Sequence, residues 1–186
     1  MNMKLLSKTI SYYLRHSPEE ADLILTSAGW ADTLELLGAL EPKFPGVSVE
    51  HLHQLIVEEP NARFELSTGD DQIRAHYGHS VPVALPVASS SPSILYHGTS
   101  PEIADLVLSG EGLRPMSRTY VHLSDNTDLA TRVGLRKSPS PVILLVDAKA
   151  LRADAGVVLM NPNDGQVWLA DSVPAKYLAR GPRVKV

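Results

Sequence analysis

The sequence predicts an α+β protein made of two lobes joined by a short linker. Residues 1–80 have the pattern of three amphipathic helices followed by two short strands. Residues 94–186 contain mainly strand-like segments with two helices among them. The segment between them, 81–93, holds three prolines and four serines and no charged residue. At 186 residues, the chain is long enough to bury a real hydrophobic core.

Three helices are predicted in the first lobe from apolar side chains at helical spacing. The first ends just before Pro18, because proline disfavours helix in the residue before it. The second has Asp32 or Thr33 as its expected N-cap. The third starts at Ser48 and ends before Pro60. The side chains expected to face the core are Leu5, Ile10, Tyr13 and Leu14 in the first helix, Leu34, Leu37 and Leu40 in the second, and Leu52, Leu55 and Ile56 in the third.

A hairpin is predicted at the end of the first lobe. The strand-like segments 63–66 and 72–75 flank the polar turn 67–71. Three helices and a hairpin form the pattern of a winged-helix module, so residues 1–80 are expected to be a winged-helix lobe. The Pro- and Ser-rich segment 81–93 is a poor helix or strand, and we expect it to be the linker.

The second lobe, residues 94–186, alternates between short strands and helices. Helices are expected at 101–108, with a proline at an early position and Gly110 after its end, and at 128–136. The sequence contains neither G-x-G-x-x-G nor G-x-x-x-x-G-K-[ST], so neither a Rossmann fingerprint nor a P-loop supports a nucleotide site. This favours an α+β lobe over a doubly wound sheet. The expected strands are 94–96, 120–123, 142–146, 157–160 and 167–169.

The composition excludes several classes of protein. The chain has no cysteine, which excludes disulfides, thiolate catalysis and cysteine-ligated metal sites. No segment approaches the ~20 apolar residues of a spanning helix, and the N-terminal segment lacks the apolar core of a signal peptide. We therefore expect a cytoplasmic protein that does not bind a membrane. No feature of the sequence indicates an obligate protein partner.

The net charge of −4 argues against nonspecific binding of nucleic acid through a broad basic surface. The charge is also uneven along the chain. Residues 1–85 carry six basic and twelve acidic side chains, and residues 86–186 carry eleven basic and nine acidic ones. An RNA substrate is therefore expected to be bound by a few arginines at one site.

Three arginines occur in strings that are compatible with phosphate binding. The string 14–18 places Arg15 and His16 at the end of the first helix, Arg74 lies on a strand beside two histidines and a glycine, and Arg136 lies near the end of the helix 128–136. A guanidinium can hold two phosphate oxygens, and an imidazole can move a proton near neutral pH. The alternative for Arg15, His16 and Arg136 is a basic helix end that favours the helix dipole. The alternative for Arg74 is the solvent face of an edge strand.

A strand that ends in His97, Gly98 and Thr99 suggests a ligand contact. Glycine permits a close approach of the backbone to a ligand, and the His and Thr side chains offer hydrogen bonds to ribose or phosphate. The alternative is a simple strand-to-helix turn in which Thr99 or Ser100 caps the next helix.

The other histidines are further candidates for ligand or metal binding. His122, Leu123 and Ser124 form another strand end with a histidine and a hydroxyl, for which a core histidine is the alternative. His51 and His53 are an i, i+2 pair, which does not share a helix face. There is no H-E-x-x-H, and carboxylates do not gather around the histidines. No metal is expected.

Six strings together resemble one enzyme family. They occur in a single order with plausible spacing, from about residue 5 to about residue 178. Together they are similar to the RNA 2′-phosphotransferases, the enzymes that finish fungal-type tRNA splicing and that have bacterial relatives. The strings are SYYLRHSPEE, RFEL with DDQIRAHYGHS, LYHGTS, VHLSDN, ATRVGLRKSPSPVILLVDA and DGQVWLADSVPAKYL.

The resemblance implies a winged-helix lobe for the RNA phosphate and a C-terminal ADP-ribosyltransferase lobe for NAD. Val167 takes the place of the glutamate of protein-modifying ADP-ribosyltransferases, which suits an anionic phosphate nucleophile. His76 and Tyr77 replace two amides of the family's usual string, so contacts near Arg74 are expected to differ. By motif, the phosphate-handling residues are Arg15, His16, Arg74 and Arg136, and the NAD-binding residues are His97, Gly98, Thr99, His122, Leu123 and Ser124.

The resemblance also implies a reaction in two steps. The RNA 2′-phosphate displaces nicotinamide from NAD, which gives a 2′-phospho-ADP-ribosylated RNA. The adjacent ribose hydroxyl then attacks the phosphate. RNA with a 2′-hydroxyl departs, and ADP-ribose 1″,2″-cyclic phosphate is the second product. Two alternatives stay open. One is a related enzyme that only ADP-ribosylates nucleic-acid phosphate ends, and the other is a non-catalytic winged-helix binding module.

Overall fold

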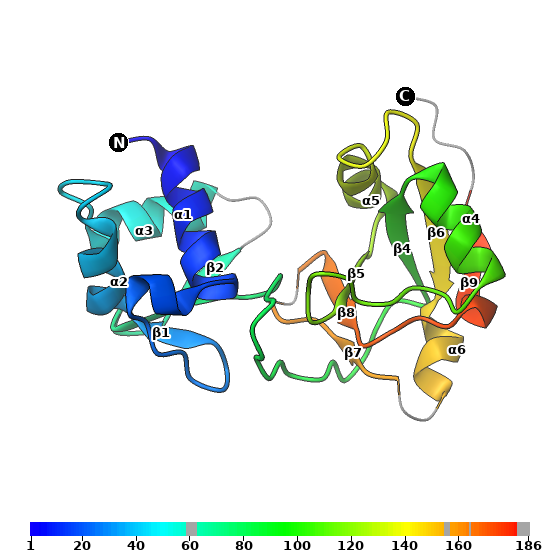
Figure 1. Ribbon diagram of the computed structural model, residues 1–186. Helices are drawn as coiled ribbons and strands as arrows, with labels where there is room; N and C mark the ends of the chain where they lie inside the picture. Colours follow the sequence, from blue (N-terminus) through cyan, green and yellow to red (C-terminus); the bar gives the residue numbers. More distant parts are fainter. Residues whose placement is uncertain (59–62, 155–156, 164, 182–186) are drawn as a thin grey trace. The chain divides into compact units, whose positions relative to one another are not determined.

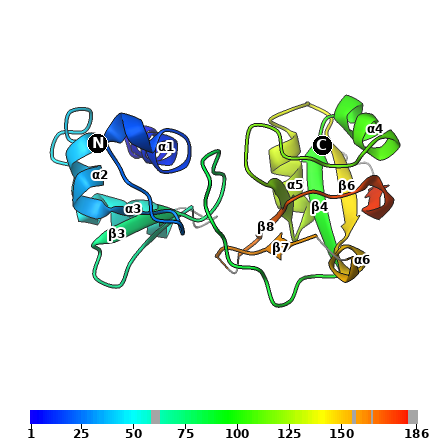
Figure 2. The same cartoon turned by 60° about the horizontal axis from the view of Figure 1, so that its bottom comes forward.

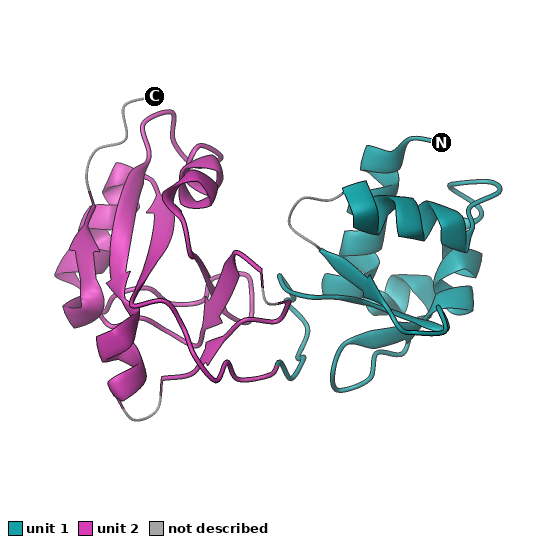
Figure 3. Cartoon of the chain, turned by 180° about the vertical axis from the view of Figure 1, so that it is seen from behind, with its two compact units in different colours: residues 1–85 teal, residues 86–186 magenta. Residues whose placement is uncertain are grey.

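The computed structural model describes residues 1–186 except 59–62, 155–156, 164 and 182–186 (Figure 1). The chain divides into two compact units, Met1–Leu85 and Pro86–Val186 (Figure 3). Each unit combines helices with an antiparallel sheet and has its own cluster of buried apolar side chains. The mixture of helices and antiparallel sheets agrees with the predicted α+β class. Among the described residues, no helix has the length and apolar character that are needed to cross a membrane.

The first unit packs its helices against a small sheet. The sheet has the order β1-β3-β2, and both pairs of strands are antiparallel. The predicted helices and the hairpin are present, and one strand that the sequence did not predict, β1, completes the sheet. In chain order the elements are α1 (Met3–Arg15), a 3-10 helix (Pro18–Ala21), β1 (Trp30–Asp32), α2 (Thr33–Leu40), α3 (Val49–Glu58), β2 (Phe64–Leu66) and β3 (Gln72–Ala75).

Side-chain caps define the start of two of these helices. The Asn2 side chain accepts a hydrogen bond from the Leu5 amide at 3.0 Å at the start of α1. At the start of α2, Asp32 accepts hydrogen bonds from the amides of Leu34 and Glu35 at 2.8 and 3.0 Å. Asp32 is therefore the cap of α2, which decides between the two residues that the sequence left open.

Two leucines that were expected in the core are exposed. Leu5 is 52% exposed and Leu34 is 75% exposed, so both predictions were wrong. Leu6 in α1 and Leu36 in α2 are fully buried instead. Each is followed four residues later by another buried side chain, at Ile10 and Leu40, and this i, i+4 row defines the inward face of each helix. Leu5 lies about 100° around the helix from Leu6, and Leu34 lies about 200° around the helix from Leu36, so both face solvent.

The second unit is built on one sheet with the strand order β7-β8-β5-β4-β6-β9. All of its pairings are antiparallel. The predicted strands and helices are present with shifted ends, and α6 and β9 are additional. The elements are β4 (Ile94–Thr99), α4 (Pro101–Ser109), β5 (Val121–Ser124), α5 (Thr127–Gly134), β6 (Val142–Asp147), α6 (Ala148–Ala153), β7 (Leu159–Met160), β8 (Val167–Ala170), a 3-10 helix (Ala175–Tyr177) and β9 (Leu178–Arg180).

This sheet separates along its middle. β4 pairs with β6 at six positions, from Ile94 to Thr99, but it pairs with β5 only where Tyr96 faces Ser124. The strands β4 and β5 therefore diverge beyond Tyr96. Helices α5 and α4 lie on either side of the β4–β6 half, as both Figure 1 and Figure 2 show.

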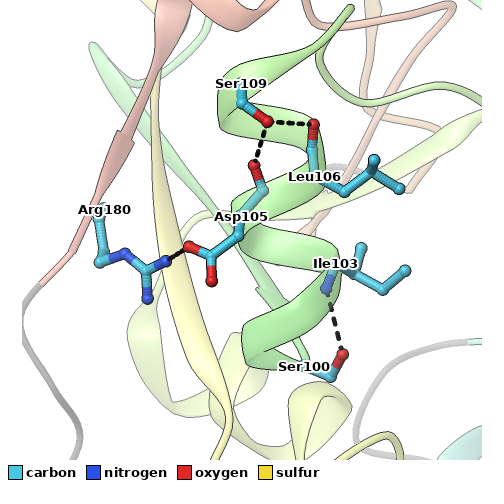
Figure 4. A network of polar contacts seen from close by, with 6 residues as sticks. All are labelled: Ser100, Ile103, Asp105, Leu106, Ser109 and Arg180. Carbon is cyan, nitrogen blue, oxygen red and sulfur yellow. Dashed lines mark hydrogen bonds and ion pairs between the residues drawn. The ribbon is translucent and has the colours of Figure 1, made fainter.

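Helix α4 has polar contacts of its own at both ends, and an ion pair connects it to the edge of the sheet (Figure 4). The Ser100 hydroxyl accepts a hydrogen bond from the Ile103 amide at 3.4 Å, so Ser100 and not Thr99 caps this helix. Near the middle of the helix, Asp105 forms an ion pair with Arg180 of β9. The Ser109 hydroxyl donates to the Asp105 carbonyl at 2.8 Å near the C-terminal end.

The segment 81–93 is exposed over most of its length, with local contacts in the unit to which each part belongs. The boundary between the units, after Leu85, falls inside it. On the side of the first unit, Val83 is 5% exposed, and the Ala84 amide donates to the Ser27 carbonyl at 2.8 Å. On the side of the second unit, Val87 forms a bridge with Met160. Val83 buries apolar surface in the first unit, whereas Val87 is 67% exposed and contacts the second unit through backbone pairing.

Candidate functional site

The end of α1 and the segment 76–80 form a hydrogen-bonded cluster. The Arg15 carbonyl accepts hydrogen bonds from the Ser80 amide at 2.9 Å and from the Ser80 hydroxyl at 3.4 Å. The same hydroxyl lies 2.9 Å from Nδ1 of His16. These contacts satisfy a carbonyl at the helix C-terminus, which has no partner within the helix, and they fix the position of the His16 ring.

The Arg15 side chain is buried between aromatic rings. Only 9% of the residue is exposed, and the guanidinium carbon lies 5.7 Å from the centre of the Phe64 ring and 5.3 Å from that of Tyr77. Gly78 has a φ of +91°, and an added Cβ there would lie 3.3 Å from Nη1 of Arg15. A glycine at this position therefore provides both the left-handed backbone and the space for the guanidinium.

His79 is a buried neutral imidazole beside this cluster. It is 3% exposed, and burial, followed by the positive charges of Arg15 and His16, lowers its pKa to about 4. At neutral pH the ring therefore adds no positive charge to the cluster. His79 is one of the two histidines that follow Arg74 in the sequence, and of these neighbours the charged group beside it is Arg15.

Arg74 has different surroundings. Its Nε and Nη2 lie 2.7 and 2.6 Å from the same carboxylate oxygen of Glu65, and its guanidinium lies over the Trp30 ring with 4.5 Å between the guanidinium carbon and the ring centre. Side chains alternate along β3, so Arg74 projects from the face opposite to that of the buried Ala75. The Arg74 guanidinium is thus paired with a carboxylate and an aromatic ring, and it projects from the central strand of its sheet, not from an edge strand.

Arg136 lies in the second unit, in the turn after α5. Helix α5 ends at Gly134, two residues earlier than predicted, and the Arg136 amide donates to the Val133 carbonyl at 3.2 Å. The Arg136 side chain is exposed to solvent. Of the four residues that the resemblance assigns to the phosphate, three are therefore in the first unit, and Arg136 is in the second.

His97 bridges the point at which β4 and β5 diverge. Its Nδ1 lies 2.8 Å from the carbonyl oxygen of His122. A carbonyl only accepts hydrogen bonds, so Nδ1 carries the proton and Nε2 of the neutral ring is an acceptor. Burial lowers the pKa of His97, and the hydrogen bond to His122 raises it by less. The sheet thereby presents a neutral imidazole where its two halves separate.

The string His97-Gly98-Thr99 belongs to a strand, so the alternative of a turn is wrong for these three residues, whereas its capping of the next helix by Ser100 is present. All three residues belong to β4 and pair with β6. An added Cβ at Gly98 would lie 1.8 Å from the Ala130 carbonyl oxygen of α5. The backbone that approaches the missing side chain of Gly98 is thus that of a helix, and this close packing accounts for the glycine. Thr99 is 5% exposed.

The string His122-Leu123-Ser124 forms β5 together with Val121. The His122 ring is half-buried, with Nδ1 at 3.1 Å from the Tyr120 carbonyl, and Ser124 is 6% exposed. Leu123 is 2% exposed and belongs to the core, so its side chain stabilises the fold. Val167 of β8 pairs with Ser124, which places an apolar residue directly beside the serine.

Metal ligands do not gather in the parts of the chain that the structure describes. Within these parts there is no group of three or more His, Cys, Asp or Glu side chains that could hold an ion. Apart from Glu65 beside Arg74, the polar groups described above in the candidate regions are arginines, imidazoles and hydroxyls, which suit an anionic ligand.

Comparison with known proteins identifies the family. Residues 1–172 match the model of the family described as "RNA 2'-phosphotransferase, Tpt1 / KptA family". The chain belongs to this family. A protein of Acetivibrio thermocellus named "Probable RNA 2'-phosphotransferase" is 40% identical over 176 residues, which cover 93% of this chain and 94% of that protein. Proteins with the same name from Bacillus thuringiensis and Agrobacterium fabrum are 40% and 41% identical, and they cover 94% and 92% of this chain. The alignments cover 93% and 91% of those two proteins.

Two residues that touch a candidate site of this RNA 2′-phosphotransferase family member were not singled out from the sequence. Glu65 lies within the string RFEL, and Trp30 precedes the second helix. Both face Arg74 through strand pairing in the three-stranded sheet. Only Glu65 had a signal in the sequence, because opposite charges on the same face of a predicted hairpin attract each other.

Proposed function

We propose that this chain removes an internal 2′-phosphate from RNA by passing it to the ADP-ribose part of NAD. The observation that carries the proposal is the match to the RNA 2′-phosphotransferase family over residues 1–172. In this proposal the first unit is a winged-helix lobe for the RNA phosphate. The second unit is an ADP-ribosyltransferase-type lobe for NAD. The three helices and the small antiparallel sheet of the first unit are consistent with this assignment.

The residues of the second unit fit a ribose ligand. Nε2 of the neutral His97 can accept a hydrogen bond from a ribose hydroxyl, and Ser124 supplies a hydroxyl on the neighbouring strand. Thr99 and His122 lie on the same two strands. NAD supplies an ADP-ribosyl group whose anomeric carbon is activated by the nicotinamide leaving group. Gly98 is assigned to the packing of α5 and not to direct contact with NAD, because α5 approaches the space where its side chain would lie.

The proposed reaction has two steps that balance without a metal. An oxygen of the RNA 2′-phosphate bonds to the anomeric carbon, the glycosidic bond breaks, and nicotinamide leaves with the electron pair. The product is 2′-phospho-ADP-ribosylated RNA. The neighbouring ribose 2″-hydroxyl then bonds to phosphorus and loses its proton, and the RNA 2′-oxygen leaves and gains a proton. RNA with a 2′-hydroxyl and ADP-ribose 1″,2″-cyclic phosphate are released.

The side chains of this chain supply charge and orientation for these steps. Arg15, Arg74 and Arg136 stabilise the negative charge that develops on the phosphate oxygens in the second step. His16, whose ring is held by Ser80, orients the phosphate or moves a proton in that step. The apolar Val167 supplies no general base, and a phosphate nucleophile needs none because it is already anionic.

One product analysis tests the proposal against its two alternatives. The protein is incubated with a 2′-phosphorylated oligonucleotide and NAD, and nicotinamide, ADP-ribosylated RNA and 2′-hydroxyl RNA are quantified. We expect nicotinamide and 2′-hydroxyl RNA, also in the presence of a chelator. Accumulation of ADP-ribosylated RNA as the final product would indicate an enzyme that only ADP-ribosylates phosphate ends. RNA binding without release of nicotinamide would indicate a binding module, and strict dependence on a divalent ion would contradict the metal-free mechanism.

A further inference from the structure

Three strands of the first unit each contribute one side chain to a row that crosses the sheet. Arg74 on β3 lies directly opposite Trp30 on β1 and Glu65 on β2. Its guanidinium lies over the indole ring at 4.5 Å and donates Nε and Nη2 to a single oxygen, Oε2, of Glu65. The guanidinium is thus restrained by neighbours on both sides of its strand.

The contact with Glu65 uses one edge of the guanidinium. An arginine has five N–H donors in a planar fork, and Glu65 takes one from Nε and one from Nη2. The donors on Nη1 and the second donor on Nη2 point away from the carboxylate. These two nitrogens form a second edge of the guanidinium, which can make a two-pronged contact with phosphate oxygens. The ion pair therefore orients the phosphate-binding edge of Arg74.

We propose that Glu65 is a positioning residue that holds Arg74 for contact with the RNA 2′-phosphate. This inference rests on the proposed function, in which Arg74 is one of the phosphate-handling arginines. Glu65 itself does not touch the substrate. It acts by fixing the direction of the guanidinium before RNA binds, so that the ordering of a long side chain does not oppose the reaction.

The two arginines of the first unit need different restraints because their surroundings differ. Arg15 is enclosed by Phe64 and Tyr77 and is 9% exposed. The Arg74 side chain is 20% exposed, and without Glu65 the stacking on Trp30 is its main restraint. An ion pair with a carboxylate that is 38% exposed adds little to folding stability, so the pair is a poor stabiliser of the hairpin. Its orienting effect on Arg74 is the larger consequence.

A double-mutant cycle separates this role from a structural one. The variants are Glu65→Ala, Arg74→Ala and the double variant, each assayed for conversion of 2′-phosphorylated RNA under saturating NAD. Glu65→Ala is expected to lower kcat about tenfold, with a smaller change in KM for RNA. In the Arg74→Ala background, the same substitution is expected to change kcat by less than about twofold. His76 makes this second background necessary, because its Nδ1 lies 3.7 Å from the same Glu65 oxygen.

Two further variants complete the design. Glu65→Gln keeps an acceptor oxygen without the charge, and it is expected to retain kcat within about threefold of the wild-type value. Asp70→Asn is the matched control. Asp70 belongs to the same hairpin, its side chain is 39% exposed, and it pairs with His53 at 2.8 Å instead of with Arg74. This variant is expected to retain the wild-type kcat.

The outcomes decide between the possible roles. If Glu65→Ala leaves kcat unchanged, or lowers it equally in both backgrounds, Glu65 does not act through Arg74. A lowered melting temperature with unchanged kcat would also overturn the proposal. If the wild-type protein itself does not convert the RNA, the proposed function fails. In that case the coupling between Glu65 and Arg74 is measured by binding in the absence of NAD. For each variant, the affinity for the 2′-phosphorylated oligonucleotide is divided by the affinity for the 2′-hydroxyl oligonucleotide. Additive effects of the two substitutions on that ratio would refute the positioning role separately.

Discussion

At the scale of single residues, Arg15 and His16 illustrate how one helix end can hold two groups in the orientation that the proposed phosphate chemistry needs. The Arg15 guanidinium is stacked on rings, and the His16 ring is fixed by a serine hydroxyl. Both are oriented through the segment that follows β3, which donates its Ser80 amide to the end of α1. Their arrangement depends on a contact between residues 65 positions apart, and sequence periodicity contains no information about such a contact.

We expect the phosphate-handling residues to matter more for the second step than for the first. The second step moves the phosphate, so charge develops on its oxygens, and the first step places positive charge on the sugar. Loss of one such donor commonly costs ~3 kcal/mol, or about a hundredfold in rate. Arg15→Ala, His16→Ala and Arg74→Ala should therefore accumulate the ADP-ribosylated RNA intermediate. A time course with a labelled 2′-phosphorylated oligonucleotide measures substrate, intermediate and product.

Lysine should not restore the function of Arg15. An ammonium group provides a point charge, which does not reproduce a planar two-pronged contact or the stacking between Phe64 and Tyr77. Arg15→Lys should therefore accumulate the intermediate as Arg15→Ala does. If the variants slow the loss of substrate as much as the formation of product, and no intermediate is visible, these residues do not act mainly in the second step.

The neutral His79 predicts a pH dependence of stability. Its pKa in the folded protein is about 4, below the ordinary value of 6.5, so the unfolded chain binds more protons between these two values. The stabilising contribution is therefore complete above pH 6.5 and is lost as the pH falls towards 4. The expected loss in the free energy of unfolding is up to about 3 kcal/mol.

Chemical denaturation at several pH values measures this effect. His79→Gln, which does not titrate in this range, should lack this part of the pH dependence even if the variant is less stable throughout. An equal slope in both proteins would show that other groups cause the acid sensitivity.

At the scale of secondary-structure elements, the crossing of β4 and α5 determines the shape of the second unit near its candidate site. Gly98 in β4 and Gly134 in α5 both lack the side chain that would separate the two backbones. An added Cβ at Gly134 would lie 3.3 Å from the Gly98 carbonyl carbon. The close packing of α5 holds β4, and thereby His97, at the point where β4 and β5 diverge.

Gly98→Ala should therefore destabilise the protein strongly. The new Cβ would lie 1.8 Å from the Ala130 carbonyl oxygen, so α5 would have to move. Overpacking of this kind typically costs about 1–3 kcal/mol, and contact with a backbone atom places the expected loss at the upper end. Gly38→Ala in α2 is the control, because nothing lies within 4 Å of its added Cβ. That change should be neutral or stabilising, by up to about 1 kcal/mol. Thermal unfolding of both variants tests the pair, and equal melting temperatures would contradict it.

The elements differ in how well the sequence predicted them. The helices and the hairpin of the first unit were found because their apolar spacing is a local signal. β1 was missed because it has three residues and exists through its pairing with β3, some 40 residues later. α6 was missed because it follows β6 without a break in the sequence. The outward positions of Leu5 and Leu34 depend on which face of each helix meets the core, and leucines one or two residues apart leave that choice open.

At the scale of the whole molecule, charge limits how RNA is bound. The net charge of the chain is −4, and the first 85 residues, which contain Arg15 and Arg74, have twice as many acidic as basic side chains. The fold class followed from local patterns along the chain. The partners of Arg74 did not, because strand pairing brings Trp30, Arg74 and Glu65 together from three separate segments.

This charge distribution predicts a weak dependence of RNA affinity on salt. For single-stranded nucleic acid, the logarithm of the binding constant falls with the logarithm of salt concentration by about 0.7 for each neutralised phosphate. In the proposed function the three arginines contact a single 2′-phosphate, so the slope should be no steeper than about −2, the value for three neutralised phosphates, and much smaller than that of a protein with a broad basic face. Fluorescence anisotropy of a 2′-phosphorylated oligonucleotide, titrated between low and physiological salt, measures the slope. The same oligonucleotide with a 2′-hydroxyl is the control, and it should bind more weakly because it lacks the phosphate that the arginines contact. A slope steeper than about −4, or equal affinity for both oligonucleotides, would mean that the chain binds the RNA backbone at large and does not select the 2′-phosphate.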